Sequence, residues 1–314
     1  IVREMEYPTK RGGKSGPTTR AYLKALDVMA NTSDVDVKLL AIPGIRHEAV
    51  TNEAIATVED RFDAMYIMDI TERDKNNSVI TGSAGKFPNI KNTAIAFKNR
   101  GLDSNFAAAY FPDVNMSVTL SDGTVKNYEN VPASVAVLGA YALNDSLKFP
   151  WYAPAGTTRG LLDEVTGLNR DLGIVNRDNL FGADINPLVK LAGTPSAYIF
   201  GQSTLQAAQS ALDRVSVRRL LIELRRSVKE VANVLLFEPN RAETLTRFSS
   251  LVNPILSRIQ EEQGVERYRV QIDTTTTTQA DVENNTIRGK IFIQPSKTAE
   301  VIALTFEASN TLED

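Results

Sequence analysis

The first half of the chain alternates helical and strand-like patterns of apolar residues. Helical periodicity runs from about Thr18 to Ala30 and again through EAVTNEAIATVEDRF at 48–62. Each helical stretch is followed by a short apolar run, VKLLAIPG at 37–44 and AMYIMDI at 64–70. Short apolar runs of this kind are typical of buried strands in a parallel sheet. The pattern therefore predicts βαβ-like units in this part of the chain.

Further segments extend this half. NTAIAFK at 92–98 is predicted as a strand, and the small-residue run NFAAAYF follows at 105–111. In MSVTLSDGTVKNY, at 116–128, the Asp-Gly pair supplies the positive φ angles of a tight turn, so a β-hairpin is predicted. VPASVAVLGAYAL, at 131–143, is about a third shorter than a membrane-spanning helix and is predicted as a buried helix.

The second half opens with an irregular stretch and then carries two long helical patterns. Residues 151–203 are rich in Gly, Pro and Asn and show few periodic runs. Helices are predicted from about Ala207 to Leu236 and from about Ala242 to Glu262, with FEPN as the stop signal between them. The second helix has one apolar stripe, and Pro254 is expected to kink or restart it.

Alternating apolar and polar residues near the end of the chain predict three strands. They lie in ERYRVQID at 266–273, IRGKIFIQP at 287–295 and EVIALTFEA at 300–308. We expect a half-buried, mainly antiparallel sheet packed under the two helices. Its predicted core residues are Val270, Ile272, Ile291, Ile293, Ile302, Leu304 and Phe306.

The change of pattern predicts a mixed α/β and α+β protein with two parts. Residues 1–148 are predicted to form an outer α/β region with a hairpin insertion near 115–128. Residues 149–314 are predicted to form a C-terminal domain of two long helices on a small sheet. A chain of 314 residues with 42% hydrophobic and 23% charged residues is long enough for two soluble cores.

Charge and rare residues exclude several kinds of site. The formal net charge of −3 gives no global attraction to nucleic acid or anionic membrane. With no cysteine, the chain can form neither a disulfide framework nor a thiolate-ligated metal site. His47 is the only histidine, so one chain cannot build a Ser-His-Asp triad or a multi-histidine metal site.

Two functional alternatives remain open from local features. PTKRGGKS, at 8–15, ends like a phosphate-binding P-loop, but Pro8 stands where that loop needs glycine and cannot donate an N–H group. The basic segment DRVSVRRLLIELRRSVKE, at 213–230, could be a nucleic-acid-binding helix. Its acids lie three or four places from arginines, and an apolar stripe runs along it, which favours an ion-paired surface or interface.

A series of motifs resembles the C-terminal domain of contractile tail sheath proteins. WYAPAGTTRG at 151–160 resembles the family's W-x-A-P-A-[GN]-x-x-x-G segment, and INPLV, YIFGQSTL and ALDRVSVRRLLIELRRS follow in the family's order. LFEPN with FSSLVNPIL, and then IFIQPSKTAEVIALTFEAS at 291–309, complete the series. The match covers roughly residues 149–314. In the first half, AMYIMDI and NFAAAYFP resemble the family's strands less specifically, with Arg61 and Asp69 in plausible places.

The resemblance implies a structural subunit rather than an enzyme. Family subunits stack around an inner tube in an extended helical lattice, and their contraction drives the tube through a cell envelope. No cofactor, nucleic acid or membrane insertion is implied. The implied partners are other copies bound by strand exchange, the inner tail tube protein, and the baseplate and tail terminator proteins. The implied location is the virion tail sheath, assembled in the host cytoplasm.

The resemblance also assigns roles to residues. Trp151, Pro154 and Gly156 are predicted to form a rigid, hinge-like entry to the C-terminal domain. The interface candidates are Arg218, Arg219, Arg225, Arg226, Arg288, Lys290, Glu300 and Glu307. Ser216 stands where the family usually has Asn. Family members usually begin with an arm of the P-G-V-Y-x-x-E type, which does not occur here, so this chain is expected to fold as a soluble monomer.

Overall fold

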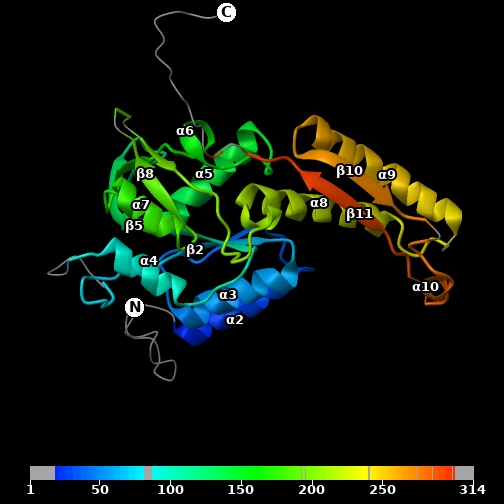
Figure 1. The fold of residues 1–314 in the computed structure, drawn as a ribbon, viewed down its shortest axis with the longest axis horizontal. Coiled ribbons are helices and arrows are strands. Elements are labelled where there is room, and N and C mark those ends of the chain that lie inside the picture. Colours follow the sequence, from blue (N-terminus) through cyan, green and yellow to red (C-terminus); the bar gives the residue numbers. More distant parts are fainter. Residues whose placement is uncertain are drawn as a thin grey trace, which may run out of the picture.

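A six-stranded sheet forms the centre of the larger part of the molecule (Figure 1). The computed structural model describes residues 18–300 except 81–86, 192, 195, 240, 274, 285 and 299. The strand order is β1-β2-β3-β8-β9-β6. The strands are β1 (Leu39–Ala41), β2 (Met65–Asp69), β3 (Ala107–Phe111), β8 (Ile185–Lys190), β9 (Ala197–Ile199) and β6 (Leu161–Leu162). The first four are parallel to one another, and the last two pair antiparallel.

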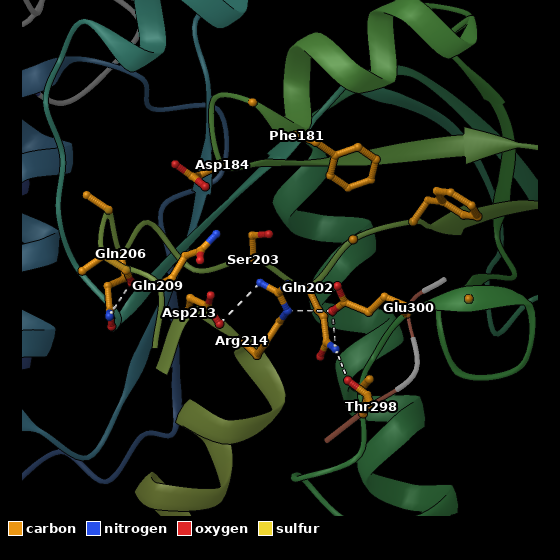
Figure 2. A pocket seen from close by; sticks show the side chains of 18 of the residues that line it. Phe181, Asp184, Gln202, Ser203, Gln206, Gln209, Asp213, Arg214, Thr298 and Glu300 are labelled. Carbon is orange, nitrogen blue, oxygen red and sulfur yellow. Dashed lines mark hydrogen bonds and ion pairs between the residues drawn. The ribbon is translucent and has the colours of Figure 1, made fainter. Parts of the chain in front are cut away.

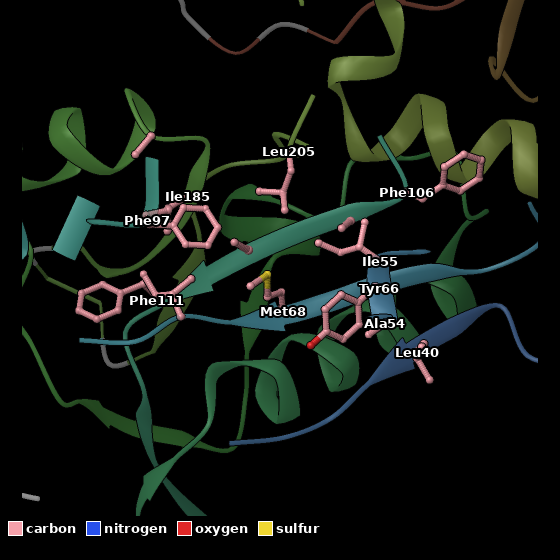
Figure 3. Close-up of a cluster of buried hydrophobic side chains, with 14 of the residues drawn as sticks. Leu40, Ala54, Ile55, Tyr66, Met68, Phe97, Phe106, Phe111, Ile185 and Leu205 are labelled. Carbon is pink, nitrogen blue, oxygen red and sulfur yellow. The ribbon is translucent and has the colours of Figure 1, made fainter. Parts of the chain in front are cut away.

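Both faces of this sheet are covered, which explains the continuous apolar runs of β2 and β3. Every residue in these two strands is buried. Tyr66, Met68 and Phe111 face a core on one side (Figure 3). That core includes side chains from α2 (Thr19–Ala30), α3 (Glu48–Arg61), α4 (Ile90–Lys98) and α7 (Ile174–Phe181). Met65 and Tyr110 face the opposite core, which is formed with α5 (Ala133–Leu147).

The prediction of a strand at 92–98 was wrong, because this segment is helix α4. Asn89 caps the helix, since its side-chain Oδ1 accepts a hydrogen bond from the backbone N–H of Asn92 at 3.0 Å. Thr93, Ala94 and Phe97 are buried, which is the three-to-four-residue spacing of a helix face. The β-branched residues in the segment obscured that spacing.

The predicted hairpin is present and belongs to a second sheet. Strands β4 (Val114–Thr119) and β5 (Val125–Val131) pair antiparallel, and Gly123 has φ +82° in the turn between them. Strand β7 (Val165–Leu168) pairs with the other side of β4. The sheet order is therefore β5-β4-β7.

The irregular stretch 151–203 completes the sheets that the first half begins. It contributes the short helix α6 (Gly156–Arg159), helix α7 and strands β6, β7, β8 and β9. Because strands from both sides of residue 148 share two sheets, the predicted division at 148/149 does not separate two cores. We propose a boundary near Arg214, where the chain leaves the sheet layer and enters the next long helix.

The C-terminal unit is a helical hairpin packed on a two-stranded sheet (Figure 1). Its elements are η1 (Ala211–Asp213), α8 (Val215–Val234), α9 (Ala242–Glu261), β10 (Val265–Gln271), α10 (Gln279–Glu283) and β11 (Lys290–Pro295). Helix α9 continues through Pro254 without a restart. Strands β10 and β11 pair antiparallel, with Tyr268 opposite Ile293. Helix α8 begins later than predicted because Arg214 has an extended backbone.

A third core joins the helices to this sheet. It contains Leu220, Leu224, Val252, Leu256, Ile259 and Val265. The predicted core residues Val270, Ile291 and Ile293 are half-buried against it, and Ile272 is 9% exposed. The predicted third strand, with Ile302, Leu304 and Phe306, lies outside the described residues.

Candidate functional site: the arginine helix, the C-terminal sheet and the cleft between units

Helix α8 connects the C-terminal unit to the sheet layer through buried arginines. The guanidinium of Arg218 lies 4.0 Å from the ring centroid of Phe106 and donates a hydrogen bond to Asn105 Oδ1. None of the described carboxylates pairs with Arg218. Burial lowers the pKa of Arg218 to about 10, because charge is costly away from water. The aromatic face partly compensates that cost.

Arg219 makes a second buried contact one residue along the helix. Its guanidinium lies 4.8 Å from the ring centroid of Tyr141 and forms an ion pair with Asp145. The Tyr141 hydroxyl contacts the Tyr110 hydroxyl, and the two rings meet edge to face. Burial raises the pKa of Tyr141 to about 12, so the phenol stays neutral at physiological pH. These contacts therefore hold helix α8 against α5 and β3.

The next turns of α8 contact the first half of the chain nearer the surface. Arg225 lies over the ring of Phe62 at 4.8 Å, and Arg226 pairs with Asp36. The hydrogen bond from Arg226 lowers the pKa of the Asp36 carboxyl. Lys38 Nζ lies 2.7 Å from Glu223 Oε2. Each such exposed pair contributes little to the free energy of folding, but all of them join the C-terminal unit to the first half of the chain.

These contacts change the interpretation of the arginine helix. Arg218 and Arg219 were predicted as interface candidates, but they are 8% and 4% exposed and their partners lie in the same chain. This assignment is corrected for both, because a buried guanidinium is not available to a second subunit. Arg225 and Arg226 also have partners within the chain. The sequence pattern did not reveal Phe106, Tyr141 or Phe62, which lie far away along the chain.

The C-terminal sheet has an exposed face and strand edges. The face opposite the helices exposes four large side chains, Arg267, Arg269, Lys290 and Phe292. Arg288, just before β11, pairs with Asp281 of α10 at 2.7 Å. Within the described ranges β10 and β11 pair only with each other, so each strand has one unpaired edge. The interface candidate Glu307 lies outside those ranges.

Trp151 contacts the C-terminal unit as the chain enters from α5. Its Nε1 donates to the carbonyl of Glu262 at 3.0 Å, and its ring stacks on Phe149 with centroids 4.7 Å apart. The ring also packs against the third core and lies close to Gly264, where an added Cβ would approach it to 3.0 Å. Pro154 is buried and Gly156 has φ +82°. The segment thus follows one fixed path between units.

A cleft of about 890 Å³ opens beside the N-terminal end of α8 (Figure 2). Arg214 Nε lies 2.7 Å from Glu300 Oε1, and Gln202 Nε2 donates to Glu300 Oε1 at 3.0 Å and to Thr298 Oγ1 at 2.7 Å. Phe181 and Phe200 line another part of the wall. The interface candidate Glu300 therefore has partners within its own chain. Thr298 and Glu300, which follow β11, are therefore bonded to Gln202 and Arg214 in the cleft wall.

The carboxyl edge of the parallel sheet, where open α/β folds bind ligands, is occupied by side chains of the protein itself. Asp69, at the end of β2, accepts hydrogen bonds from Ser134 N at 2.8 Å and Ser134 Oγ at 2.7 Å, which caps α5. Arg46 forms two hydrogen bonds with Asp113. Burial raises the pKa of Asp113, although Arg46 opposes this rise. Carboxylates thus fill the helix N-terminus that could otherwise hold an anion.

Other chemistry finds no support among the residues described. No group of three or more His, Asp or Glu side chains there could hold a metal ion. His47 precedes α3 without a side-chain capping bond. None of the helices in the described ranges is long and apolar enough to cross a membrane. The P-loop-like segment 8–15 lies outside those ranges.

Comparison with known proteins identifies the family. Residues 207–309 match the model of the phage tail sheath C-terminal domain. The tail sheath protein of Vibrio phage KVP40 is 33% identical over 224 residues, which are 68% of this chain and 33% of that protein. The chain belongs to the tail sheath protein family. The tail sheath protein of Enterobacteria phage T4 is 25% identical over 311 residues, 95% of this chain and 46% of its own length.

Solved structures share the tail sheath fold. A chain of the anti-feeding prophage baseplate aligns with a TM-score of 0.70 at 18% identity, covering 98% of this chain and 80% of that chain. A chain of the contracted sheath complex of PVC, an extracellular contractile injection system, aligns with a TM-score of 0.69 at 22% identity, covering 91% and 75%. The chain spans between about a third and a half of the two phage tail sheath proteins.

Proposed function

We propose that the chain is a structural subunit of a contractile tail sheath. Copies would stack around an inner tube in an extended helical lattice and rearrange into a shorter, wider one, driving the tube through a cell envelope. The observation that carries this proposal is the match to tail sheath proteins over most of the chain. The free energy would be stored in contacts between subunits, so we infer no catalysis and no cofactor.

The C-terminal sheet is the proposed site of attachment between neighbours. Strands β10 and β11 each have an unpaired edge within the described ranges. An extended arm of another copy can add a strand to such an edge, because main-chain hydrogen bonds supply affinity without demanding a particular side-chain sequence. Lys290 and Arg269 on the exposed face would discourage unspecific pairing. We propose that the edge of β11 accepts an arm from an adjacent subunit.

The contacts of α8 support movement of the subunit as nearly one body. Arg218 and Arg219 are buried between the units, and separating them would leave an uncompensated charge. A lattice that contracts by moving rigid subunits needs such internal connections and flexible links elsewhere. The further partners we propose are the inner tail tube, baseplate and tail terminator proteins. The proposed location is the virion tail, after assembly in the host cytoplasm.

Electron microscopy of the purified chain, alone and with the arm of a related sheath protein fused to its N-terminus, tests this function. Tubes or rings of regular helical symmetry are expected once the arm of one copy pairs with the edge of β11 in the next copy. A proline substitution at Phe292, which removes a main-chain donor from β11, should weaken assembly. The matched control is Phe292→Ala, which also removes the aromatic ring but keeps the main-chain N–H. Particles that never associate under any of these conditions contradict the proposal.

A further inference from the structure

The turn between α8 and α9 exposes an apolar tip, formed by Val234, Leu236 and Phe237. Their exposed fractions are 65%, 60% and 104%. Phe237 has φ +69°, a backbone conformation that bulky residues rarely adopt. Soluble proteins seldom expose neighbouring large apolar side chains without a partner. The apolar tip therefore has the character of an interaction surface.

The cleft beside α8 contains aromatic side chains that could receive such a tip. Phe181 is 36% exposed and Phe200 is 40% exposed, and both line the cleft. Figure 2 shows Phe181 at the wall of the open space. The cleft volume of about 890 Å³ exceeds that of a phenylalanine side chain several-fold. Phe181 and Phe200 define the aromatic end of the cleft.

The cleft wall carries charges of both signs. Arg214 pairs with Asp213 and Glu300, Asp184 has no ion pair among the described residues, and two further arginines lie near the aromatic end. Arg159 lines the cleft, and the guanidinium of Arg177 lies 5.9 Å from the ring centroid of Phe200. Both arginines donate to backbone carbonyls, and neither pairs with a carboxylate among the described residues. Glu238 follows Phe237 directly and is exposed, and its one ion pair within the described part of the chain is a long contact of 3.7 Å to Arg247. An incoming tip would bring this carboxylate to two arginines that lack one.

The two surfaces cannot meet within one chain. Arg214, at the N-cap of α8, lines the cleft, while Val234 is the last residue of the helix. A helix of 20 residues is about 30 Å long and keeps its ends apart. The tip of one copy can reach the cleft only in another copy. Such a contact joins different surfaces on the two partners, so it can repeat into an open helical array rather than close as a dimer.

We propose that the apolar tip of one copy docks into the aromatic end of the cleft of a second copy, with Phe237 between Phe181 and Phe200 and Glu238 beside Arg159 and Arg177. The identity of the partner rests on the proposed sheath function, in which many copies lie side by side. The two surfaces lie at opposite ends of α8. Each contact therefore shifts the next copy in the direction of this helix. The contact is distinct from strand addition at β11.

Cross-linking between two single-cysteine variants tests the contact, since the natural chain has no cysteine. Asn233→Cys places a thiol next to the tip, and Ser203→Cys places one in the cleft. The variants are mixed and treated with a short bismaleimide, and the product is identified by mass spectrometry. The mixture is expected to give a heterodimer, with far less product from either variant alone.

Substitutions in the Asn233→Cys variant test whether the cross-link depends on the apolar tip. Phe237→Asp should reduce the heterodimer at least about tenfold, because central aromatic residues dominate protein interfaces. Phe87→Asp is the matched control, since Phe87 is 71% exposed and lies away from both surfaces, and it should leave the yield unchanged. Both substitutions replace exposed side chains, so an unchanged thermal midpoint verifies folding.

Failure of the tip–cleft contact can be distinguished from failure of the proposed sheath function. A mixture that gives no heterodimer at the highest soluble concentration overturns the tip–cleft contact, and so does a yield that Phe237→Asp leaves unchanged. Electron microscopy of the same samples reports on the sheath function separately. Regular tubes without the heterodimer would show that copies assemble through other surfaces, which rejects this inference and retains the proposed function.

Discussion

Arg219 of α8 lies over the ring of Tyr141 of α5, with 4.8 Å between the guanidinium and the ring centroid. The same guanidinium pairs with Asp145, one turn further along α5. A cation that contacts both an aromatic face and a carboxylate is held in place by two partners on one helix. This arrangement fixes how the helical hairpin leaves the sheet layer, and it makes Arg219 part of the subunit's interior.

Arg219→Ala is expected to lower the free energy of unfolding by about 2–4 kcal/mol, because it leaves Asp145 without its buried partner and uncovers Tyr141. Arg225→Ala is the matched control on the same helix. Arg225 is exposed and lies over Phe62 without a carboxylate, so its loss should cost less than about 1 kcal/mol. Urea unfolding measures both. Equal effects of the two substitutions would contradict the distinction between buried and surface arginines.

Trp151→Ala should destabilise the C-terminal unit by about 2–4 kcal/mol, since the half-buried ring stacks on Phe149 and packs against the third core. Trp151→Phe keeps a stacking ring but loses the hydrogen bond to Glu262, so about 1 kcal/mol should be lost. Thermal unfolding followed by tryptophan fluorescence, with circular dichroism for the variants, measures this. An unchanged midpoint in Trp151→Ala would show that the ring contributes nothing to the junction.

Two aspartates should titrate on opposite sides of the ordinary aspartate pKa of 3.8. Arg226 lowers the pKa of Asp36, so its stabilising contribution is present above pH 3.8 and disappears as the pH falls through the folded-state pKa. Burial raises the pKa of Asp113, so its ionisation reduces stability as the pH rises from 3.8 through the folded-state pKa. NMR of the aspartate carboxyl carbons in isotope-labelled protein measures the titration midpoints of Asp36 and Asp113. The reverse order of the two midpoints would refute the assignment.

The arginine helix should not bind DNA. Its four arginines are already engaged by Phe106, Asp145, Phe62 and Asp36, so no continuous row of free cations remains for phosphates. Fluorescence anisotropy with labelled duplex DNA should show no saturable binding at physiological ionic strength. Binding that weakens steeply with added salt, and that is lost in Arg225→Ala, would reverse this conclusion.

The periodic pattern predicted the elements that bury one clear face. Helices α3 and α9 and strands β2 and β10 begin and end within about two residues of the predicted bounds. The strand predicted at 92–98 was wrong because β-branched residues masked a helical face capped by Asn89. The short strands β6 and β9 carry too few residues to show a period, so their place in the central sheet could not be predicted.

The roles of the arginines could not be predicted from spacing alone. The apolar stripe of α8 correctly indicated a core, and the interleaved acids suggested ion pairs along the helix. The actual partners lie 113 residues away for Arg218, at Asn105, and 74 residues away for Arg219, at Asp145. Contacts over such separations depend on how the sheet layer places α5 and β3. Only the three-dimensional structure reveals them.

Helical reconstruction of assembled tubes by cryo-electron microscopy tests the central claim most directly. Each subunit is expected to retain the contacts of Arg218 and Arg219 with its own sheet layer, and an additional strand from a neighbouring copy is expected to pair with the β10–β11 sheet. The same internal contacts should persist in extended and contracted tubes. Tubes in which this sheet gains no strand, or in which α8 separates from α5 on contraction, would contradict the account.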